Sequence, residues 1–104
     1  MKYAAEKIII AYNQVFSLPY TILRPSALYG ERCISRRVGQ IFIENALFDK
    51  ELVINGDGKE KLDFTYIEDL TDGILNIINN NNSINQIFNL TYGEGREINE
   101  MINI

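Results

Sequence analysis

PYTILRP, residues 19–25, is the stretch that decides the fold class of this 104-residue chain. It is a short run rich in β-forming residues, and Pro19 and Pro25 bound it. It lacks the alternation of polar and apolar residues that a half-exposed strand shows. We therefore predict a buried strand of a parallel sheet at these residues.

Helices are predicted on both sides of this strand. Residues 3–16 carry apolar side chains at three- and four-residue spacings around most of the helix circumference, so this helix requires neighbours on more than one side. Residues 38–48 and the segment after Tyr66 show the same spacing. Acidic residues open the latter helix, where they favour the positive end of its dipole. Residues 98–104 begin a last helix.

The remaining segments predict short strands and turns. Residues 51–66 indicate two strands around the turn Gly56-Asp57-Gly58, residues 86–92 a further strand, and residues 93–97 a turn. Residues 27–37 indicate a loop. The alternation of strands and helices predicts an α/β fold with partly parallel pairing.

Composition excludes several classes of function. Hydrophobic residues make up 46% of the chain and charged residues 23%, as in folded proteins. A net charge of −4 without histidine speaks against nucleic acid and anionic membranes as partners. Cys33 has no second thiol with which to form a disulfide or hold zinc. No membrane span or signal peptide is visible, so we expect a cytoplasmic protein.

Tyr3 and Lys7 are the candidate catalytic residues. Four residues along a helix put both side chains on one face, where an ammonium favours the ionised form of a phenol. Chance alone gives roughly 0.3 such pairs in a chain of this length and composition. The plain alternative is a surface pair, worth about 0.3–0.5 kcal/mol in water. The pair therefore makes a base only in a site closed to water.

The order of four segments adds weight to this pair. Tyr-x-x-x-Lys at 3–7, LPYTILRPSALYGER at 18–32, INGDGKEKLDFTYIEDL at 54–70 and IFNLTYGEG at 87–95 together resemble the C-terminal half of the extended short-chain dehydrogenase/reductase family, the NAD-dependent sugar-nucleotide epimerases and dehydratases. The resemblance implies a partial Rossmann-like α/β fold, with the N-terminal dinucleotide-binding half missing. The chain would form one unit: residues 1–32 belong to the Rossmann-like core, and 33–104 mainly to the substrate-binding region.

The resemblance also implies roles for individual residues. Tyr3 would take a proton from a sugar hydroxyl while hydride passes to NAD, and Lys7 would bind the nicotinamide ribose. Further cofactor contacts would come from the turn after the strand, mostly through backbone groups, although a simple strand-to-loop turn is the alternative. The residues of this turn are Pro25, Ser26, Ala27 and Leu28.

The nucleotide-sugar site departs from the family pattern. Many members carry an arginine directly before the Asp-Phe pair, where it can grip a diphosphate, and this chain has Leu62. The positive charge would have to come from elsewhere. The candidates are Arg32, Lys61 and Arg96, each of which is otherwise an ordinary solvated surface residue.

The Gly-rich turn of a dinucleotide-binding fold does not precede Tyr3, and Gly93-Glu94-Gly95 is a lone turn. We therefore expect the isolated chain to be inactive. Because its first helix is apolar around most of its circumference, we also expect a homo-oligomer through this helix, with residues 8–15 central. Two interpretations of function remain open. One is an NAD-dependent epimerase or dehydratase acting on a nucleotide-activated sugar, and the other is a non-catalytic module for sugar-nucleotide binding or assembly.

Overall fold

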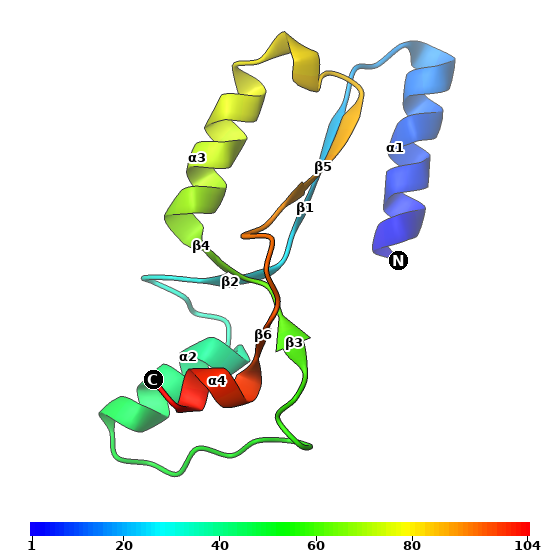
Figure 1. Cartoon of the computed structure of the whole chain (residues 1–104). Helices are drawn as coiled ribbons and strands as arrows, with labels where there is room; N and C mark the ends of the chain where they lie inside the picture. The colour runs from blue at the N-terminus through cyan, green and yellow to red at the C-terminus, as the bar shows by residue number, and fades with distance from the viewer.

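The structure, a computed structural model, describes all residues 1–104. Four α-helices, six short strands and one 3₁₀ turn follow each other along the chain (Figure 1). In order they are α1 (Lys2–Phe16), β1 (Thr21–Pro25), β2 (Ala27–Tyr29), α2 (Val38–Leu47), β3 (Lys61–Leu62), β4 (Phe64–Tyr66), α3 (Ile67–Ile78), η1 (Asn81–Ser83), β5 (Gln86–Leu90), β6 (Arg96–Glu97) and α4 (Ile98–Ile102).

The predicted helices are confirmed. Each of the four lies within a few residues of the expected range. Glu68 and Asp69 stand in the first turn of α3, as the sequence predicts. Helix α4 begins with a capping box between Glu97 and Glu100, which satisfies backbone N–H groups that a helix start leaves free. Local signals thus fix the helices of this chain.

Strand β1 pairs in parallel with β5, from Thr21 beside Gln86 to Pro25 beside Leu90. The parallel strand predicted at residues 19–25 is therefore confirmed. The predicted burial is wrong for most of the strand, because only Ile22 of β1 is buried and Leu23 is half-buried. Helix α3 packs on the β5 side, where Gly73 lies against the Leu90 side chain.

Two further strand pairs correct the sequence-based predictions. Residues 27–29 are strand β2, parallel to β4, and not part of a loop. No hairpin forms around Gly56-Asp57-Gly58, since residues 51–60 contain no strand. Instead β3 pairs antiparallel with β6, inside the segment predicted as a turn. In each case a partner distant in sequence supplies the hydrogen bonds that a local turn does not.

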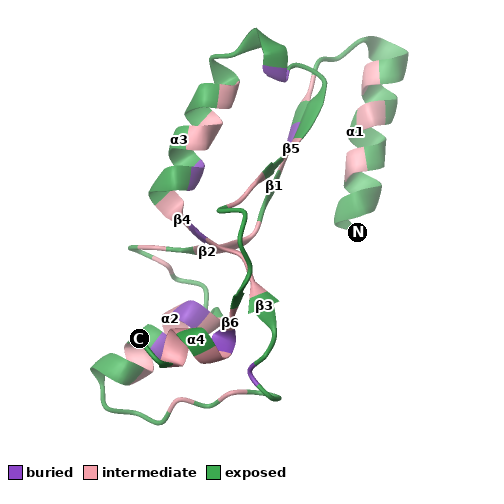
Figure 2. Ribbon diagram, viewed as in Figure 1, coloured by how far each residue is buried: buried purple, intermediate pink, exposed green.

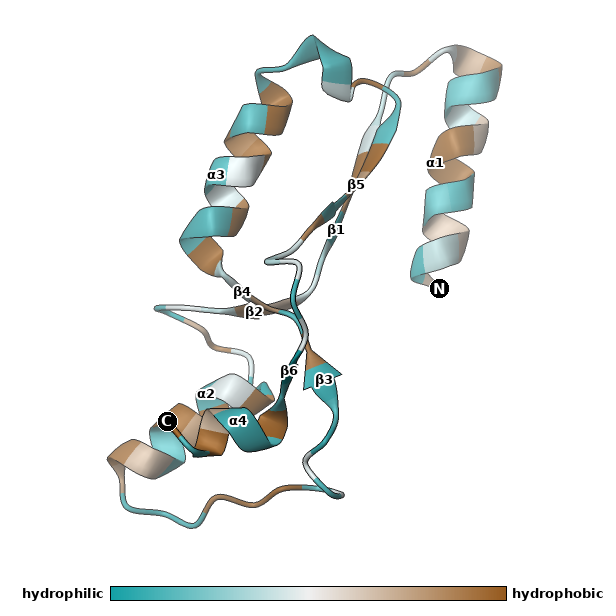
Figure 3. Cartoon of the chain, viewed as in Figure 1, coloured by the Kyte–Doolittle hydropathy of each residue, from teal (hydrophilic) through white to brown (hydrophobic).

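The chain leaves much of its apolar surface open. Only 8 of the 104 residues are buried, and α1 contains none of them (Figure 2). The radius of gyration of 17.4 Å exceeds the value of about 13 Å expected for a compact domain of this length. Hydrophobic and hydrophilic residues follow each other along α1, which has no other element on its outer side (Figure 3). None of the helices has the length and apolar character needed to cross a lipid bilayer.

Candidate functional site

Tyr3 and Lys7 lie on one face of α1. The Lys7 Nζ atom is 5.1 Å from the centroid of the Tyr3 ring, within the range of a cation–π contact. Both residues belong to the first two turns of the helix, where the dipole favours a negative charge. The Tyr3 side chain is open to solvent, with 67% of its surface exposed. The two groups can therefore act together on a ligand that approaches this face.

An ion pair attaches this end of α1 to β1. Arg24 Nε and Nη2 donate hydrogen bonds of 2.8 and 2.6 Å to the two carboxylate oxygens of Glu6. The hydrogen bonds from Arg24 hold the pKa of Glu6 below its ordinary value, against the opposing effect of burial. The pKa of Arg24 is raised, first by these hydrogen bonds and then by the charge of Glu6, with a smaller contribution from the nearby Tyr3.

Arg24 therefore lies within electrostatic reach of the Tyr3 phenol, as a second cation besides Lys7. Sequence reasoning missed both Glu6 and Arg24. Glu6 lies between Tyr3 and Lys7 in the sequence. Arg24 directly precedes Pro25, the last residue of β1. The available signal was a charged residue in a mostly apolar strand, because a charge on a strand expected to be buried requires an oppositely charged partner.

The carboxyl ends of β1 and β5 meet at one edge of the sheet, the edge at which open α/β folds bind ligands. The N-terminal end of α1 lies near the same edge (Figure 1). The turn predicted to contact a cofactor follows β1 here. Its polar groups are engaged inside the fold: the Ser26 hydroxyl and the Ala27 N–H both donate to the carbonyl oxygen of Asp63. Ala27 and Leu28 also pair with β4.

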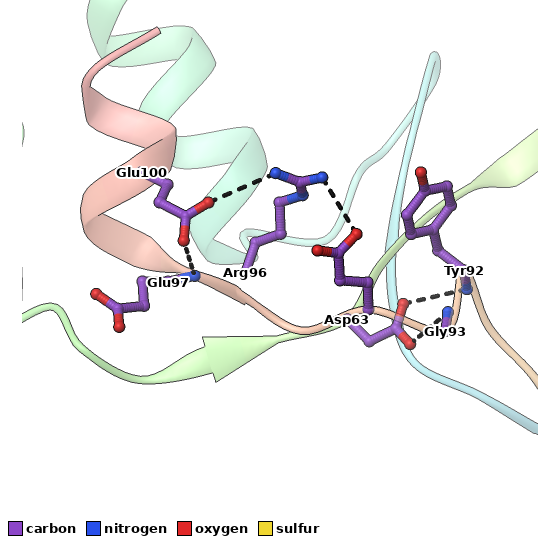
Figure 4. Close-up of polar contacts among 7 residues, drawn as sticks. Asp63, Tyr92, Gly93, Arg96, Glu97 and Glu100 are labelled. Carbon is purple, nitrogen blue, oxygen red and sulfur yellow. Dashed lines mark hydrogen bonds and ion pairs between the residues drawn. The ribbon is translucent and has the colours of Figure 1, made fainter.

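Asp63 fastens the end of β5 to this turn. Its two carboxylate oxygens accept hydrogen bonds from the backbone N–H groups of Tyr92 and Gly93, at 3.1 and 2.9 Å (Figure 4). The hydroxyl oxygen of the buried Thr65 accepts a second bond from the Tyr92 N–H and lies 2.9 Å from the Ser26 hydroxyl. Sequence reasoning used Asp63 only as a landmark, because its partners lie about thirty residues away.

An open cleft of about 690 Å³ lies beyond this junction. Its walls come from β2, β4, α2, α4 and the segment that follows β5. Three aromatic side chains, three smaller apolar residues, one glycine, three carboxylates and one arginine line it. They are Tyr29, Phe64, Tyr92, Gly39, Ile43, Met101, Ile104, Glu94, Glu97, Glu100 and Arg96.

The structure separates the three cations predicted to bind substrate. Arg96 lines the cleft, and neither Lys61 nor Arg32 does. Leu62 is the cross-strand partner of Arg96, and Lys61 is that of Glu97. Arg32 lies in the connection between β2 and α2, with a φ of +63°.

Tyr66 is a second phenol near the cleft wall, where its ring is 5.5 Å from that of Tyr29. The negative charge of Glu68 raises the pKa of Tyr66, and burial and the nearby Glu31 raise it further. Tyr66 is therefore held in its protonated form, whereas Tyr3 has cations for neighbours.

The chain matches known proteins along nearly its whole length. Residues 1–91 match the NAD dependent epimerase/dehydratase family. A putative UDP-glucose 4-epimerase of Methanocaldococcus jannaschii is 35% identical, over 99% of this chain and 34% of that protein. The crystal structure of UDP-glucuronic acid 4-epimerase from Bacillus cereus, with UDP-glucuronic acid and NAD, superposes with a TM-score of 0.90 at 32% identity.

That superposition covers 98% of this chain and 33% of the Bacillus enzyme. A UDP-glucose 4-epimerase from Thermotoga maritima, solved with UDP-glucose, gives a TM-score of 0.90 at 30% identity over the same shares of the two chains. The present chain thus spans about a third of the length of the relatives it matches. The predicted fold class, a C-terminal portion of a Rossmann-like α/β fold, is confirmed, and the chain belongs to the NAD-dependent epimerase/dehydratase family of sugar-nucleotide enzymes.

Proposed function

We propose that this chain supplies the catalytic Tyr–Lys helix and part of the substrate site of an NAD-dependent epimerase or dehydratase acting on a nucleotide-activated sugar. The observation that carries this is the position of Lys7, whose Nζ lies 5.1 Å from the Tyr3 ring on the helix that Glu6 and Arg24 hold at the carboxyl edge of the β1–β5 sheet. The relatives named above bear the names of epimerases that act on UDP-sugars.

In this proposal the Tyr3 phenolic oxygen takes the proton of a sugar hydroxyl. Lys7, the helix N-terminus and Arg24 all favour the negative charge that Tyr3 carries as a base. NAD, when bound, supplies the chemistry of hydride acceptance. Tyr3 and Lys7 fit the ribose end of such a cofactor, because a phenol and an ammonium face the same open side of α1.

The residues of the turn after β1 fit a supporting role. The Ser26 hydroxyl and the Ala27 N–H are already committed to Asp63, which leaves Pro25 and Leu28 to shape the wall of the site. The Gly-rich turn that would hold the pyrophosphate is not among these 104 residues. NAD binding by this chain would thus rest on Tyr3 and Lys7.

We further propose that the chain alone is catalytically inactive. Ionising a tyrosine side chain at neutral pH costs about 4 kcal/mol relative to its protonated form, because the ordinary pKa of a tyrosine is about 10. An exposed pair of side chains four residues apart on a helix supplies only about 0.3–0.5 kcal/mol. With 67% of Tyr3 exposed, water screens the charges that favour its ionised form. A covering surface is therefore part of the active site.

A chimera tests this function. The first two thirds of the Methanocaldococcus relative, joined to this chain, would provide the covering surface and the cofactor turn. We expect the chimera to interconvert UDP-glucose and UDP-galactose or to dehydrate a nucleotide sugar. We expect Tyr3→Phe to lower kcat by about 100-fold or more, as for the loss of a general base. Tyr12→Phe on the same helix is the matched control. Equal activities of the Tyr3→Phe and unsubstituted chimeras would refute the proposal.

A second candidate function is assembly. Ile8, Tyr12 and Val15 follow each other at helical spacing on α1, and each is more than half exposed. We propose that a second copy of the chain covers this stripe, so that the protein is a homo-oligomer through α1. The burial of such side chains contributes about 1.5–3 kcal/mol each, which makes their exposure costly for a small domain.

A further inference from the structure

The charges that line the cleft are unevenly distributed. Arg96 is its one cationic residue, whereas Glu94, Glu97 and Glu100 supply three carboxylates. Rings of Tyr29, Phe64 and Tyr92 form apolar walls on which a planar base can lie. Arg96 is thus the one residue of the cleft lining whose charge attracts an anionic group.

We propose that Arg96 is the diphosphate-binding residue of the cleft, and that Glu94 and Glu100 hold its guanidinium in place and compete with the ligand for it. This inference rests on the proposed function, because it assigns a residue to the nucleoside diphosphate of the substrate. It selects one of the three cations that the sequence left open.

The β3–β6 register gives Arg96 this place. Leu62 and Arg96 are direct cross-strand partners, so their side chains lie on the same face of the ribbon. A guanidinium at position 96 therefore extends over the same surface as a side chain at position 62, where this chain has no charge. Lys61 pairs with Glu97 and, unlike Arg96, does not line the cleft. The neighbouring strand thus provides a cation where Leu62 cannot.

The carboxylates around Arg96 are close enough to orient its guanidinium, and the ion pairs are weak enough for a ligand to displace them. Arg96 Nη2 lies 3.3 Å from Glu94 Oε2, and Nη1 lies 3.6 Å from Glu100 Oε2 (Figure 4). All three side chains are more than half exposed. Exposed ion pairs contribute little net stability, because water competes with them. A phosphate that accepts two parallel hydrogen bonds from the guanidinium is a stronger partner and can replace them.

The same geometry predicts an electrostatic cost. Three carboxylates against one guanidinium give the cleft lining an excess of negative charge, which repels a diphosphate. Removal of one carboxylate charge lowers this repulsion and frees one of the two terminal nitrogens of the Arg96 guanidinium. Loss of the arginine has the opposite effect on affinity.

Calorimetric titration of the 104-residue chain with UDP, and with uridine as the phosphate-free probe, tests the inference. We expect UDP to bind more tightly than uridine. We expect Arg96→Gln to weaken UDP binding about tenfold or more and to leave uridine binding unchanged. Lys61→Gln removes the same charge at a position that does not line the cleft, and it should change UDP affinity by no more than about twofold. Glu100→Gln should tighten UDP binding several-fold.

The outcomes separate this inference from the proposed function. If the unsubstituted chain binds UDP and Arg96→Gln binds it equally well, or if Lys61→Gln loses as much affinity, Arg96 is not the binding residue and the proposed function stands. If Glu100→Gln weakens UDP binding, the carboxylate of Glu100 does not compete with the ligand for Arg96, and that part of the inference is refuted. If the chain binds neither UDP nor uridine, the inference falls together with the sugar-nucleotide assignment. Unchanged far-UV circular dichroism of each variant excludes unfolding as the cause.

Discussion

Glu6 of α1 and Arg24 of β1 join the first helix to the first strand through two charge-assisted hydrogen bonds, with Arg24 Nη2 only 2.6 Å from Glu6 Oε2. Glu6 lies between Tyr3 and Lys7 in the sequence, so the ion pair that attaches the helix also sets the position of the proposed catalytic residues. No residue of α1 is buried. The polar contacts of Glu6 near one end and of Asn13 near the other, where its amide bonds to Leu18 and Asn85, therefore determine where α1 lies.

Removal of this ion pair is expected to detach the N-terminal end of α1. A 15-residue helix is marginal in water without tertiary contacts, so Arg24→Met should increase the rate of hydrogen exchange at the backbone amides of Lys2–Phe16. The amides of β5 should keep their protection. Arg36→Met, which changes an exposed arginine elsewhere, is the control. Unchanged protection of α1 in Arg24→Met would show that other contacts hold the helix.

The same attachment is expected to weaken in acid. Because the pKa of Glu6 is lowered in the folded chain by its hydrogen bonds from Arg24, Glu6 binds a proton more readily in the unfolded state. Its contribution to stability is complete above about 4.3, the ordinary pKa of glutamate, and is lost as the pH falls through the lowered pKa of Glu6. Hydrogen exchange in α1, followed across this range, should show an acid-dependent loss of protection that Glu6→Gln removes. An equal loss in Glu6→Gln would assign it to other carboxylates.

The sequence predicts the features that depend on near neighbours and misses those that depend on distant ones. The common face of Tyr3 and Lys7 follows from a four-residue spacing within one helix. The two- and three-residue strands β2, β3 and β6 carry too few residues for a pattern, and their register depends on partners far along the chain, as with Leu62 and Arg96. The apolar run of β1 predicts a strand covered on both faces, whereas only Ile22 is buried here, because burial depends on what packs against a strand and not on the strand alone.

Asp63 provides a test of the junction beside the cleft. Asp63→Asn replaces one accepting oxygen with an amide that donates, so either the N–H of Gly93 loses its partner or that of Tyr92 keeps only Thr65. We expect a loss of about 1–3 kcal/mol in the free energy of unfolding, measured by urea denaturation. Asp72→Asn, at an exposed position of α3, should cost about 0.5 kcal/mol or less. Equal losses in the two variants would mean that the carboxylate of Asp63 does not hold this junction.

The exposed stripe of α1 is expected to drive self-association of the chain. Ile8 and Val15 stand two turns apart on one side of the helix, with 59% and 72% of their surfaces exposed. Light scattering should therefore show a mass above that of one 12.0 kDa chain, rising with concentration. The double variant Ile8→Lys/Val15→Lys places two like charges on the stripe and should reduce the mass to that of a monomer. Leu75→Lys, a comparably exposed position on α3, should leave the association unchanged. A compact monomer of the unsubstituted chain at high concentration would contradict the proposed oligomer, since no second copy would then cover α1.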